Sequence, residues 1–494
     1  MTHLYFKKLV SAINNNRLFV GLLSVFFILG LILGVVRYIT YIAGFDYSIF
    51  TQTLWHYSQF GAPHSSIRDV NNILGDHFHP LLIVLTPLFW LWNNPLVLTV
   101  VQSITFALSA VPIYVLGRKH FGRNNALLIS TAYLLSHGLQ YALFFDFHEI
   151  ALAVPIVAWL IYSIDVERYK TVILCCVLLC LLKEELVLLS AMVGVVLILK
   201  KRKYKLGTGI FIGSLMFFVA LTKLIMPWLA GKTRYNQYWT YDSYGSSFAD
   251  MAKNALTKPI DFSTKLYRDV FQNSVKTSTL LTLVLSSGIT MFFSWYILLA
   301  APNLAVRMLS DRGTFYWSYW FHYGAILMPI IFFCFIDVLR KIQVKVSPKV
   351  VTALCVALCI YSIGLMMNKN FPFAQVINPE FYSLNSDVRS GEAKVQEIVG
   401  KNSSVTAPVV ITPHFANRES IHLLTDKGRW YNDENIVLTG EPITDFVVLN
   451  TKLPITDVEP YYTYDHFKYD LEHIGYKIIH QDDQSGWIVY KKLQ

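Results

Sequence analysis

Ionisable residues interrupt a very apolar chain in several short motifs. The most compact motif is GDHFHP, residues 75–80, which places Asp76, His77 and His79 within four positions. Pro80 suits the first position of a helix and disfavours helical backbone at His79, so the motif predicts a loop that leads into a helix. Such a loop leaves a carboxylate and two imidazoles facing a ligand. The structural alternative is that His79 caps the helix and Asp76 pairs with a histidine.

Acidic residues mark two further motifs. In FFDFHEI, Asp146 and Glu149 are three residues apart and share one face if the segment is helical, with His148 between them. LLKEELVLL inserts three charges into an apolar segment: Lys183, Glu184 and Glu185. The structural alternatives are an interfacial helix terminus for the first motif and a solvated turn with an internal Lys–Glu pair for the second.

Two more ionisable residues stand next to apolar segments. Asp46 lies in GFDYSIF, directly after the first long apolar run, and His322 ends the aromatic stretch TFYWSYWFH. Either residue alone fits a membrane interface, where an acid or an aromatic belt is common. Together with the other motifs they are compatible with three chemistries: glycosyl transfer with a carboxylate base, binding of a divalent metal, and ion-coupled transport.

Composition identifies the class of protein that must position these residues. The mean hydropathy is +0.43, with 54% hydrophobic and only 15% charged residues among 494, which indicates a polytopic membrane protein. The net charge of +10 is concentrated in short basic clusters between apolar runs, at 118–123, 200–205 and 340–349. This pattern is typical of cytoplasmic loops and argues against nucleic-acid binding. All six cysteines lie in apolar segments, so neither disulfides nor zinc ligation by cysteine is expected.

The basic clusters predict the topology. Lys7, Lys8 and Arg17 place the N-terminus in the cytoplasm before a first span at 18–40. We expect about eleven spans in an all-α bundle in the cell membrane, with external loops at 41–80 and 230–277. The run 81–93 is too short for an ordinary span and is predicted to be re-entrant or interfacial.

The tail differs from the rest of the chain. From residue 370 the long apolar runs end, and SVTAPVVI, DFVVLN, YKIIH and GWIVYKK have the β-branched composition of strands. SDVRSGEAKVQEIVG and YDLEHIG are expected to form helices. The sequence therefore predicts a transmembrane domain at 1–369 and a soluble extracytoplasmic α/β domain at 370–494.

In this topology every ionisable motif falls at the outer membrane face. A charge at membrane depth costs several kcal/mol unless it is paired or lines a wet cavity. One outward-facing, water-filled pocket would account for the shared location of all these residues: Asp46, Asp76, His77, His79, Asp146, His148, Glu149, Lys183, Glu184, Glu185 and His322.

The motifs also resemble a known family. GFDYSIFTQTLW, LGDHFHP, FFDFHE, LLKEE, LAAPNL with RMLS, FHYGAILMPIIF and, in the tail, TPHFANRESIHLL are similar to the membrane family called domain of unknown function 2079 (DUF2079). That family resembles the GT-C type glycosyltransferases. The resemblance implies a polyprenyl-phosphate-linked sugar donor and a base at Asp46, in the first external loop, with Asp146 and Glu149 near a second acidic position. The chain departs from that pattern at Tyr47, where many GT-C enzymes carry a second acid, and in GDHFHP.

The preferred hypothesis is an inverting glycosyltransferase with an outward-facing site, in which Asp46 or Asp76 deprotonates an acceptor hydroxyl. The acceptor would be a glycan of the cell envelope, a lipid or a protein. Lys183, with Arg234 or Lys232, would hold the phosphate. The remaining substrate-binding residues would be His77, His79, His148, Glu184 and His322, and a divalent metal on Asp76, His77 and His79 is the candidate cofactor. The alternatives are a transporter or flippase, which would favour internal repeats and broken helices, and a non-catalytic scaffold.

Overall fold

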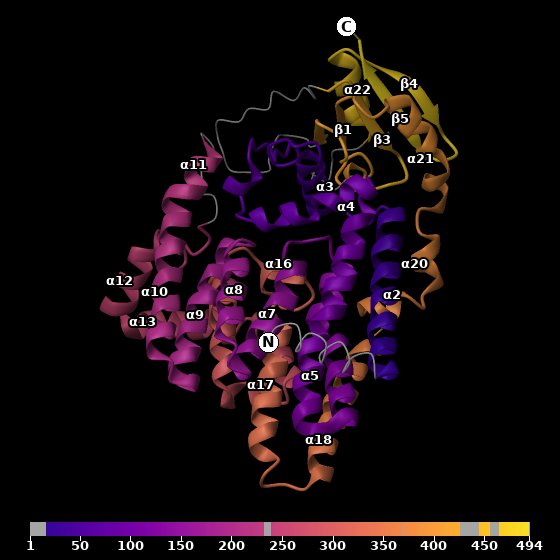
Figure 1. Ribbon diagram of the computed structural model, residues 1–494. Helices are drawn as coiled ribbons and strands as arrows, with labels where there is room; N and C mark the ends of the chain where they lie inside the picture. The colour runs from indigo at the N-terminus through magenta and orange to yellow at the C-terminus, as the bar shows by residue number, and fades with distance from the viewer. Residues whose placement is uncertain (1–15, 232–238, 369, 425–443, 455–463, 494) are drawn as a thin grey trace.

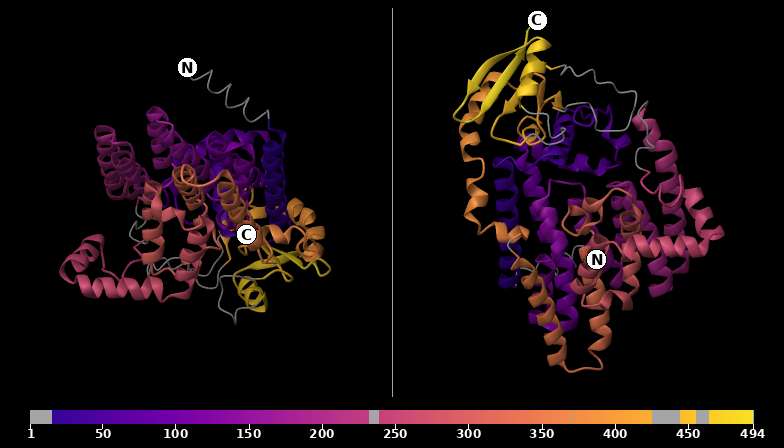
Figure 2. Two further views of the ribbon diagram at one scale, coloured as in Figure 1. Left: turned by 90° about the horizontal axis from the view of Figure 1, so that it is seen from below. Right: turned by 180° about the vertical axis from the view of Figure 1, so that it is seen from behind.

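The computed structural model describes the chain apart from residues 1–15, 232–238, 369, 425–443, 455–463 and 494. Helices form an upright bundle, and a small β-sheet lies at one end of it (Figure 1). The segment from α18 to α21 climbs along one side of the bundle to reach the sheet (Figure 2). The fold is therefore mostly helical with a C-terminal sheet, as the composition predicts.

The first half of the described chain alternates long helices with short ones. The elements in chain order are α2 (Arg17–Ile39), α3 (Phe45–Ser58), η1 (Ile73–Gly75), η2 (Pro80–Leu85), α4 (Thr86–Leu91), α5 (Leu96–Leu134), α6 (His137–Phe144), α7 (Ile150–Asp165), α8 (Tyr169–Cys180), α9 (Glu184–Lys201), α10 (Tyr204–Ala220), η3 (Leu221–Ile225) and α11 (Met226–Ala230). Within α5 the backbone of Gly122 is not helical, with φ of 80°. Because only glycine adopts this conformation easily, α5 is two helices joined at the basic cluster where the sequence predicts a turn.

The second half begins with two surface helices. Residues 230–277, which are predicted to form an external loop, contain the helices α12 (Phe248–Thr257) and α13 (Pro259–Phe271). The Ser247 side chain caps the first of them and Pro259 begins the second, and both helices expose large apolar side chains. The helices that follow are α14 (Ser274–Ser286), η5 (Thr290–Phe293), η6 (Trp295–Ala300), α15 (Ala301–Leu309), α16 (Thr314–Trp317), η7 (His322–Gly324), α17 (Leu327–Ile342), α18 (Pro348–Met366), α19 (Pro372–Gln375), α20 (Pro379–Ser383), α21 (Ser386–Val399), η8 (Thr412–His414) and α22 (Tyr464–His473).

Four helices of the described chain are long and apolar enough to cross a membrane: α2, α5, the segment Tyr204–Ala230, and α18. The expected number of about eleven spans is therefore not confirmed. Several of the predicted spans are shorter apolar helices, among them Ile150–Asp165 and Tyr169–Cys180. The run 81–93 forms η2 and α4, which together are too short to span a bilayer, as predicted.

The sheet has five strands in the order β2-β1-β3-β5-β4. Parallel pairing joins β1 (Val405–Ala407) to β2 (Ile421–Leu423) and to β3 (Phe446–Asn450), whereas β5 (Trp487–Lys492) is antiparallel to β3 and to β4 (Tyr476–Asp482). Four of these strands coincide with the four predicted runs, and β2 was missed because its sequence IHL has only one β-branched residue. We call residues 386–493 the sheet region.

The sheet region packs directly on the segment that follows α2, residues 40–80, which we call the first loop. A shared apolar cluster joins Tyr41 and Ile49 to Trp487 and other core residues of the sheet region. The hydroxyls of Ser48 and Thr412 are 2.8 Å apart, and His414 Nε2 is 3.1 Å from the carbonyl oxygen of Tyr38. Helix α3 is therefore held between the bundle and the sheet region.

Helices α9 and α10 approach each other through two glycines. A Cβ at Gly207 would lie 2.6 Å from the carbonyl oxygen of Gly194, and a Cβ at Gly194 would lie 2.4 Å from that of Gly207. Both close contacts are with backbone, which cannot move aside as a side chain can. The position of α9 matters for the site because Lys183 and Glu184 stand at its beginning.

We expect Gly207→Ala to destabilise the protein, by about 1–3 kcal/mol, because the new methyl group separates the two helices. Gly209→Ala is the matched control in the same helix, since a Cβ there meets no atom within 4 Å. Thermal unfolding of both variants in detergent measures the difference. Equal stability of the two variants would contradict the close packing of α9 on α10.

Candidate functional site

Asp46 lies in the first turn of α3, where its carboxylate faces the ionisable cluster. It is partly buried, and among the described residues no hydrogen bond or ion pair engages its side chain. Burial raises the pKa of Asp46, and the nearby carboxylates of Asp146 and Glu149 add to this effect while His148 opposes it. An unpaired carboxyl group with a raised pKa has the properties of a general base.

Asp146 anchors the beginning of α3. Its Oδ2 accepts hydrogen bonds from the backbone N–H groups of Gly44 at 3.1 Å and Tyr47 at 3.3 Å, and Arg37 Nη2 donates to Oδ1 at 3.2 Å. Both carboxylate oxygens are therefore engaged, and a narrow cavity lined partly by Arg37, Tyr47 and Gln102 borders the contact. Asp146 fixes the helix that carries Asp46, so its geometry is that of a positioning residue.

Asp76 is bound by an arginine that the sequence analysis did not single out. Arg68 forms a bidentate pair with it, Nε to Oδ2 at 2.9 Å and Nη2 to Oδ1 at 2.7 Å, and both side chains are almost inaccessible. Two parallel charge-assisted hydrogen bonds hold a carboxylate ionised and in place. The geometry therefore favours Asp46 over Asp76 as the base.

Glu149 is the centre of a buried charge cluster. Its side chain is 1% exposed and forms ion pairs with Lys183, Oε1 to Nζ at 2.8 Å, and with Nδ1 of His148. Burial alone would raise the pKa of Glu149, but His148 and Lys183 hold it well below its ordinary value. Burial would likewise lower the pKa of Lys183, but Glu149 and the two neighbouring glutamates raise it. The glutamate and the lysine are therefore both charged at neutral pH.

His77 ties the GDHFHP loop to the beginning of α9. Its Nδ1 is 2.8 Å from Glu184 Oε1, and the backbone N–H of Phe78 donates to Oε2 of the same carboxylate at 3.1 Å. Burial would lower the pKa of His77, but Glu184 outweighs it and raises the pKa. Burial would raise the pKa of Glu184, but His77 and Lys183 lower it to about 2.

This pair should give the protein a pH-dependent stability. The lowered pKa of Glu184 contributes stability above its ordinary value of 4.5 that is lost as the pH falls toward 2. The raised pKa of His77 contributes stability below its ordinary value of 6.5 that is lost as the pH rises through the raised pKa. We expect His77→Gln to lower the melting temperature most between pH 4.5 and 6.5. Thermal unfolding across pH, with exposed His473→Gln as control, tests this; a pH-independent difference would contradict it.

The imidazoles of His79 and His322 lie beside the charge cluster. Phe50 lies with its ring centroid 5.6 Å from that of His79 and 5.2 Å from that of His148, and His148 stacks on His322 at 4.3 Å. Burial lowers the pKa of His79, to about 4, and that of His322, so both rings are neutral. Among the described residues, His79 Nδ1 and both ring nitrogens of His322 are buried without a hydrogen-bond partner. Buried unpaired nitrogens of this kind need a ligand or water.

The sequence signal for Arg307 was the RMLS segment. This buried arginine donates to four backbone carbonyls, among them those of Ser318 at 2.8 Å and Tyr323 at 3.3 Å, so it holds the loop that presents His322. Arg37 and Arg68 were missed because their acidic partners lie in other motifs or further along the same loop. In the sequence, nothing distinguishes Arg37 from an arginine at the end of a membrane span or Arg68 from an ordinary loop arginine.

The expected metal site and the expected water-filled pocket differ from what the structure shows. Asp76, His77 and His79 do not gather as metal ligands, because Asp76 pairs with Arg68 and His77 pairs with Glu184. The expected open, wet pocket is instead a set of mostly buried and mutually paired side chains. Arg234 and Lys232 lie outside the described residues.

Comparison with known proteins agrees with this architecture. Residues 37–489 match the family model described as "Predicted membrane protein (DUF2079)". Among solved structures, the chain is similar to ArnT from Cupriavidus metallidurans bound to undecaprenyl phosphate, with a TM-score of 0.54 and 9% identity over 94% of this chain and 97% of that chain. At this identity the likeness shows the fold alone. No curated protein matches the chain. The resemblance to DUF2079 is thereby confirmed, and the fold is similar to that of ArnT.

Proposed function

The chain belongs to the DUF2079 family of predicted membrane proteins, and from this premise we propose that it is an integral-membrane glycosyltransferase. Its donor would be a sugar linked to polyprenyl phosphate, and its acceptor a hydroxyl group of a glycan, lipid or protein. The ArnT-like fold supports a lipid-phosphate donor, because that relative is bound to undecaprenyl phosphate. Fold likeness does not determine activity, so the proposal depends on the site.

The observation that carries the proposal is the unpaired Asp46 carboxylate, which interacts electrostatically with His148 and Glu149. Glu149 in turn pairs with the buried Lys183, and His148 stacks on His322. In the proposed reaction Asp46 takes the proton of the acceptor hydroxyl, and the resulting oxygen nucleophile attacks the anomeric carbon. The bond from that carbon to the phosphate oxygen breaks, and polyprenyl phosphate leaves with the electron pair. Attack from the face opposite the phosphate inverts the sugar. A phosphate leaves as an anion, so no general acid is needed.

Lys183 is proposed to stabilise the leaving phosphate. An ammonium group has three N–H donors, and Glu149 engages one of them at 2.8 Å. The remaining donors would interact with phosphate oxygens in a site from which water is largely excluded, where such interactions are strong. Arg234 or Lys232 is proposed as a second cation that binds the leaving phosphate.

The neutral imidazoles are proposed to bind the sugar. His79 and His322 have buried ring nitrogens without a partner among the described residues, and a neutral imidazole both donates and accepts. The stacked pair His148 and His322 would place such nitrogens near the sugar hydroxyls. Glu184 would act indirectly, by fixing His77 and the GDHFHP loop.

The membrane arrangement is part of the proposal. We place the N-terminus in the cytoplasm, a transmembrane domain at 1–369 with about eleven spans, and an extracytoplasmic domain at 370–494. The contact of Ser48 with Thr412 supports this arrangement, because the first loop and the sheet region must then lie on one side. Labelling of single cysteines at exposed positions 60 and 401 should show both on the outer face.

The test of function is transfer by the purified protein in liposomes that contain polyprenyl-phosphate sugars. A panel of hexosyl and pentosyl donors is incubated with candidate acceptors, and release of polyprenyl phosphate and formation of the glycoside are measured. We expect one donor class to be consumed, with inverted stereochemistry at the anomeric carbon. Movement of the intact donor across the bilayer without cleavage would contradict the proposal.

A further inference from the structure

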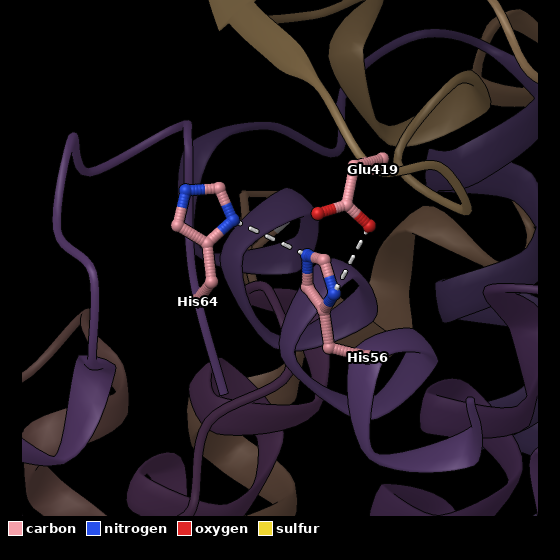
Figure 3. A group of neighbouring side chains, drawn as sticks. All are labelled: His56, His64 and Glu419. Atoms are coloured by element: carbon pink, nitrogen blue, oxygen red, sulfur yellow. Dashed lines mark hydrogen bonds and ion pairs between the residues drawn. The ribbon is translucent and has the colours of Figure 1, made fainter. Parts of the chain in front are cut away.

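A second group of ionisable side chains lies at the other end of α3. His56 is in the last turn of α3, His64 is in the loop that follows, and Glu419 precedes β2 in the sheet region. Figure 3 shows the three side chains directed toward one another across the junction of the first loop with the sheet region. His56 lies ten residues after Asp46, which is about 15 Å along a helix, so this group is separate from the site described above.

The spacing of these atoms suits a metal ion. His64 Nδ1 is 3.4 Å from His56 Nε2, and His56 Nδ1 is 3.7 Å from a Glu419 carboxylate oxygen. One ligand atom from each residue lies within 4.8 Å of the other two. The 3.4 Å and 3.7 Å distances end at different nitrogens of the His56 ring, of which a metal ion binds one. Rotation of the His64 or the exposed Glu419 side chain would therefore complete the coordination.

The backbone around the three residues is already fixed. Gln52, one turn before His56, donates to Ser66 Oγ at 2.8 Å and to the backbone carbonyl of Glu419 at 3.1 Å. Ser66 Oγ in turn donates to the carbonyl of Ile421 at 2.6 Å. These bonds hold the segments that carry His56, His64 and Glu419 side by side without a metal, so little ordering would be required on binding.

The surroundings also favour a bound cation. The His56 side chain is buried in the protein. Glu419 is 77% exposed, so the group is open to solvent on one side and an ion can enter. In the described part of the chain, no other group brings three such ligand atoms this close together.

We propose that His56, His64 and Glu419 bind one divalent transition metal ion that fastens α3 to the sheet region. Two imidazoles and one carboxylate are a ligand set that Zn²⁺ prefers, and water would fill the fourth position. The ion adds a coordination link between the first loop and the sheet region, across a junction otherwise held by hydrogen bonds and apolar packing. Its role is structural, and it stands independently of the glycosyl-transfer proposal.

The experiment uses the full-length protein in detergent, stripped of metal with a chelator and titrated with Zn²⁺. Calorimetry and elemental analysis should show one equivalent of zinc. Substitution of one ligand in a three-residue site should weaken binding by about 100-fold, so His64→Ala and Glu419→Gln are the decisive variants. Glu419 is exposed and His64 partly so, and neither substitution leaves a cavity in the core. His473→Asn, an exposed histidine on α22, is the matched control and should bind as the unmodified protein does.

Hydrogen exchange provides a readout that does not depend on activity. Zinc should slow exchange of backbone amides in residues 412–424 of the unmodified protein and of His473→Asn, but not of Glu419→Gln. Absence of zinc binding, or binding that His64→Ala and Glu419→Gln leave unchanged, would overturn the proposal. If His64→Ala and Glu419→Gln lose zinc binding but retain sugar transfer, the result supports the metal site and does not contradict the proposed function.

Discussion

Asp46→Asn should lower kcat for sugar transfer by about 10²–10⁴-fold, the range expected when a general base is removed. The amide has nearly the same shape but cannot accept the acceptor's proton. Binding of the donor should change little, because Lys183 and the imidazoles are unaltered. Transfer kinetics in liposomes and donor affinity measured by calorimetry separate these two effects.

The pH profile gives the same residue a second signature. Burial raises the pKa of Asp46, so the basic form is lost at a higher pH than for an ordinary aspartate, whose pKa is 3.8. The value of kcat/KM should therefore fall as the pH decreases through that raised pKa, and Asp46→Asn should abolish this limb of the profile.

Asp261→Asn is the matched control, because Asp261 also lies in the first turn of a helix but is exposed on α13. It should retain normal transfer and the normal pH profile. Full activity of Asp46→Asn would instead show that another group, or no general base, removes the proton.

Lys183→Met should have the second-largest effect, because it removes both a proposed phosphate ligand and the partner of a buried charge. Breaking a buried ion pair by removal of one member typically costs about 3–5 kcal/mol. His148 remains beside Glu149, so we expect a loss at the lower end of that range. Thermal unfolding in detergent and transfer kinetics measure stability and activity on the same preparation.

The double variant Lys183→Met/Glu149→Gln separates the two roles. Removing the second charge should restore much of the stability, because no uncompensated carboxylate is left buried. It should not restore transfer if Lys183 holds the leaving phosphate. Recovery of both stability and activity would contradict that role.

Lys200 supplies the matched control for this experiment. It forms a comparable pair with the buried Asp337, Nζ to Oδ1 at 2.6 Å, at the cytoplasmic end of α9 in the proposed topology. Lys200→Met should lower stability modestly, because Arg340 also pairs with Asp337, and it should leave the KM for the donor unchanged.

Much of the site was predictable from the sequence because hydropathy limits where polar residues can lie. Apolar runs of helical length separate the loop that carries GFDYSIF and GDHFHP from FFDFHE, and FFDFHE from KEE. Buried charges in a membrane bundle must find partners. Asp46, His79, Lys183 and His322 accordingly all interact with Glu149 in the structure, while their roles stay predictions. The strands of the sheet region were similarly visible in their β-branched runs, except for the three-residue β2.

Only the tertiary structure decided which side chains pair and which stay unpaired. Asp46 and Asp146 look alike in the sequence. Arg37 and two backbone amides bind the carboxylate of Asp146, whereas none of these groups binds that of Asp46. Likewise, nothing in the sequence relates His56 and His64 to Glu419. Pairing depends on the rotation of each helix about its axis and on the course of the loops, which place atoms to within an ångström. Hydrophobic periodicity encodes which face is buried, but it carries no information on that scale.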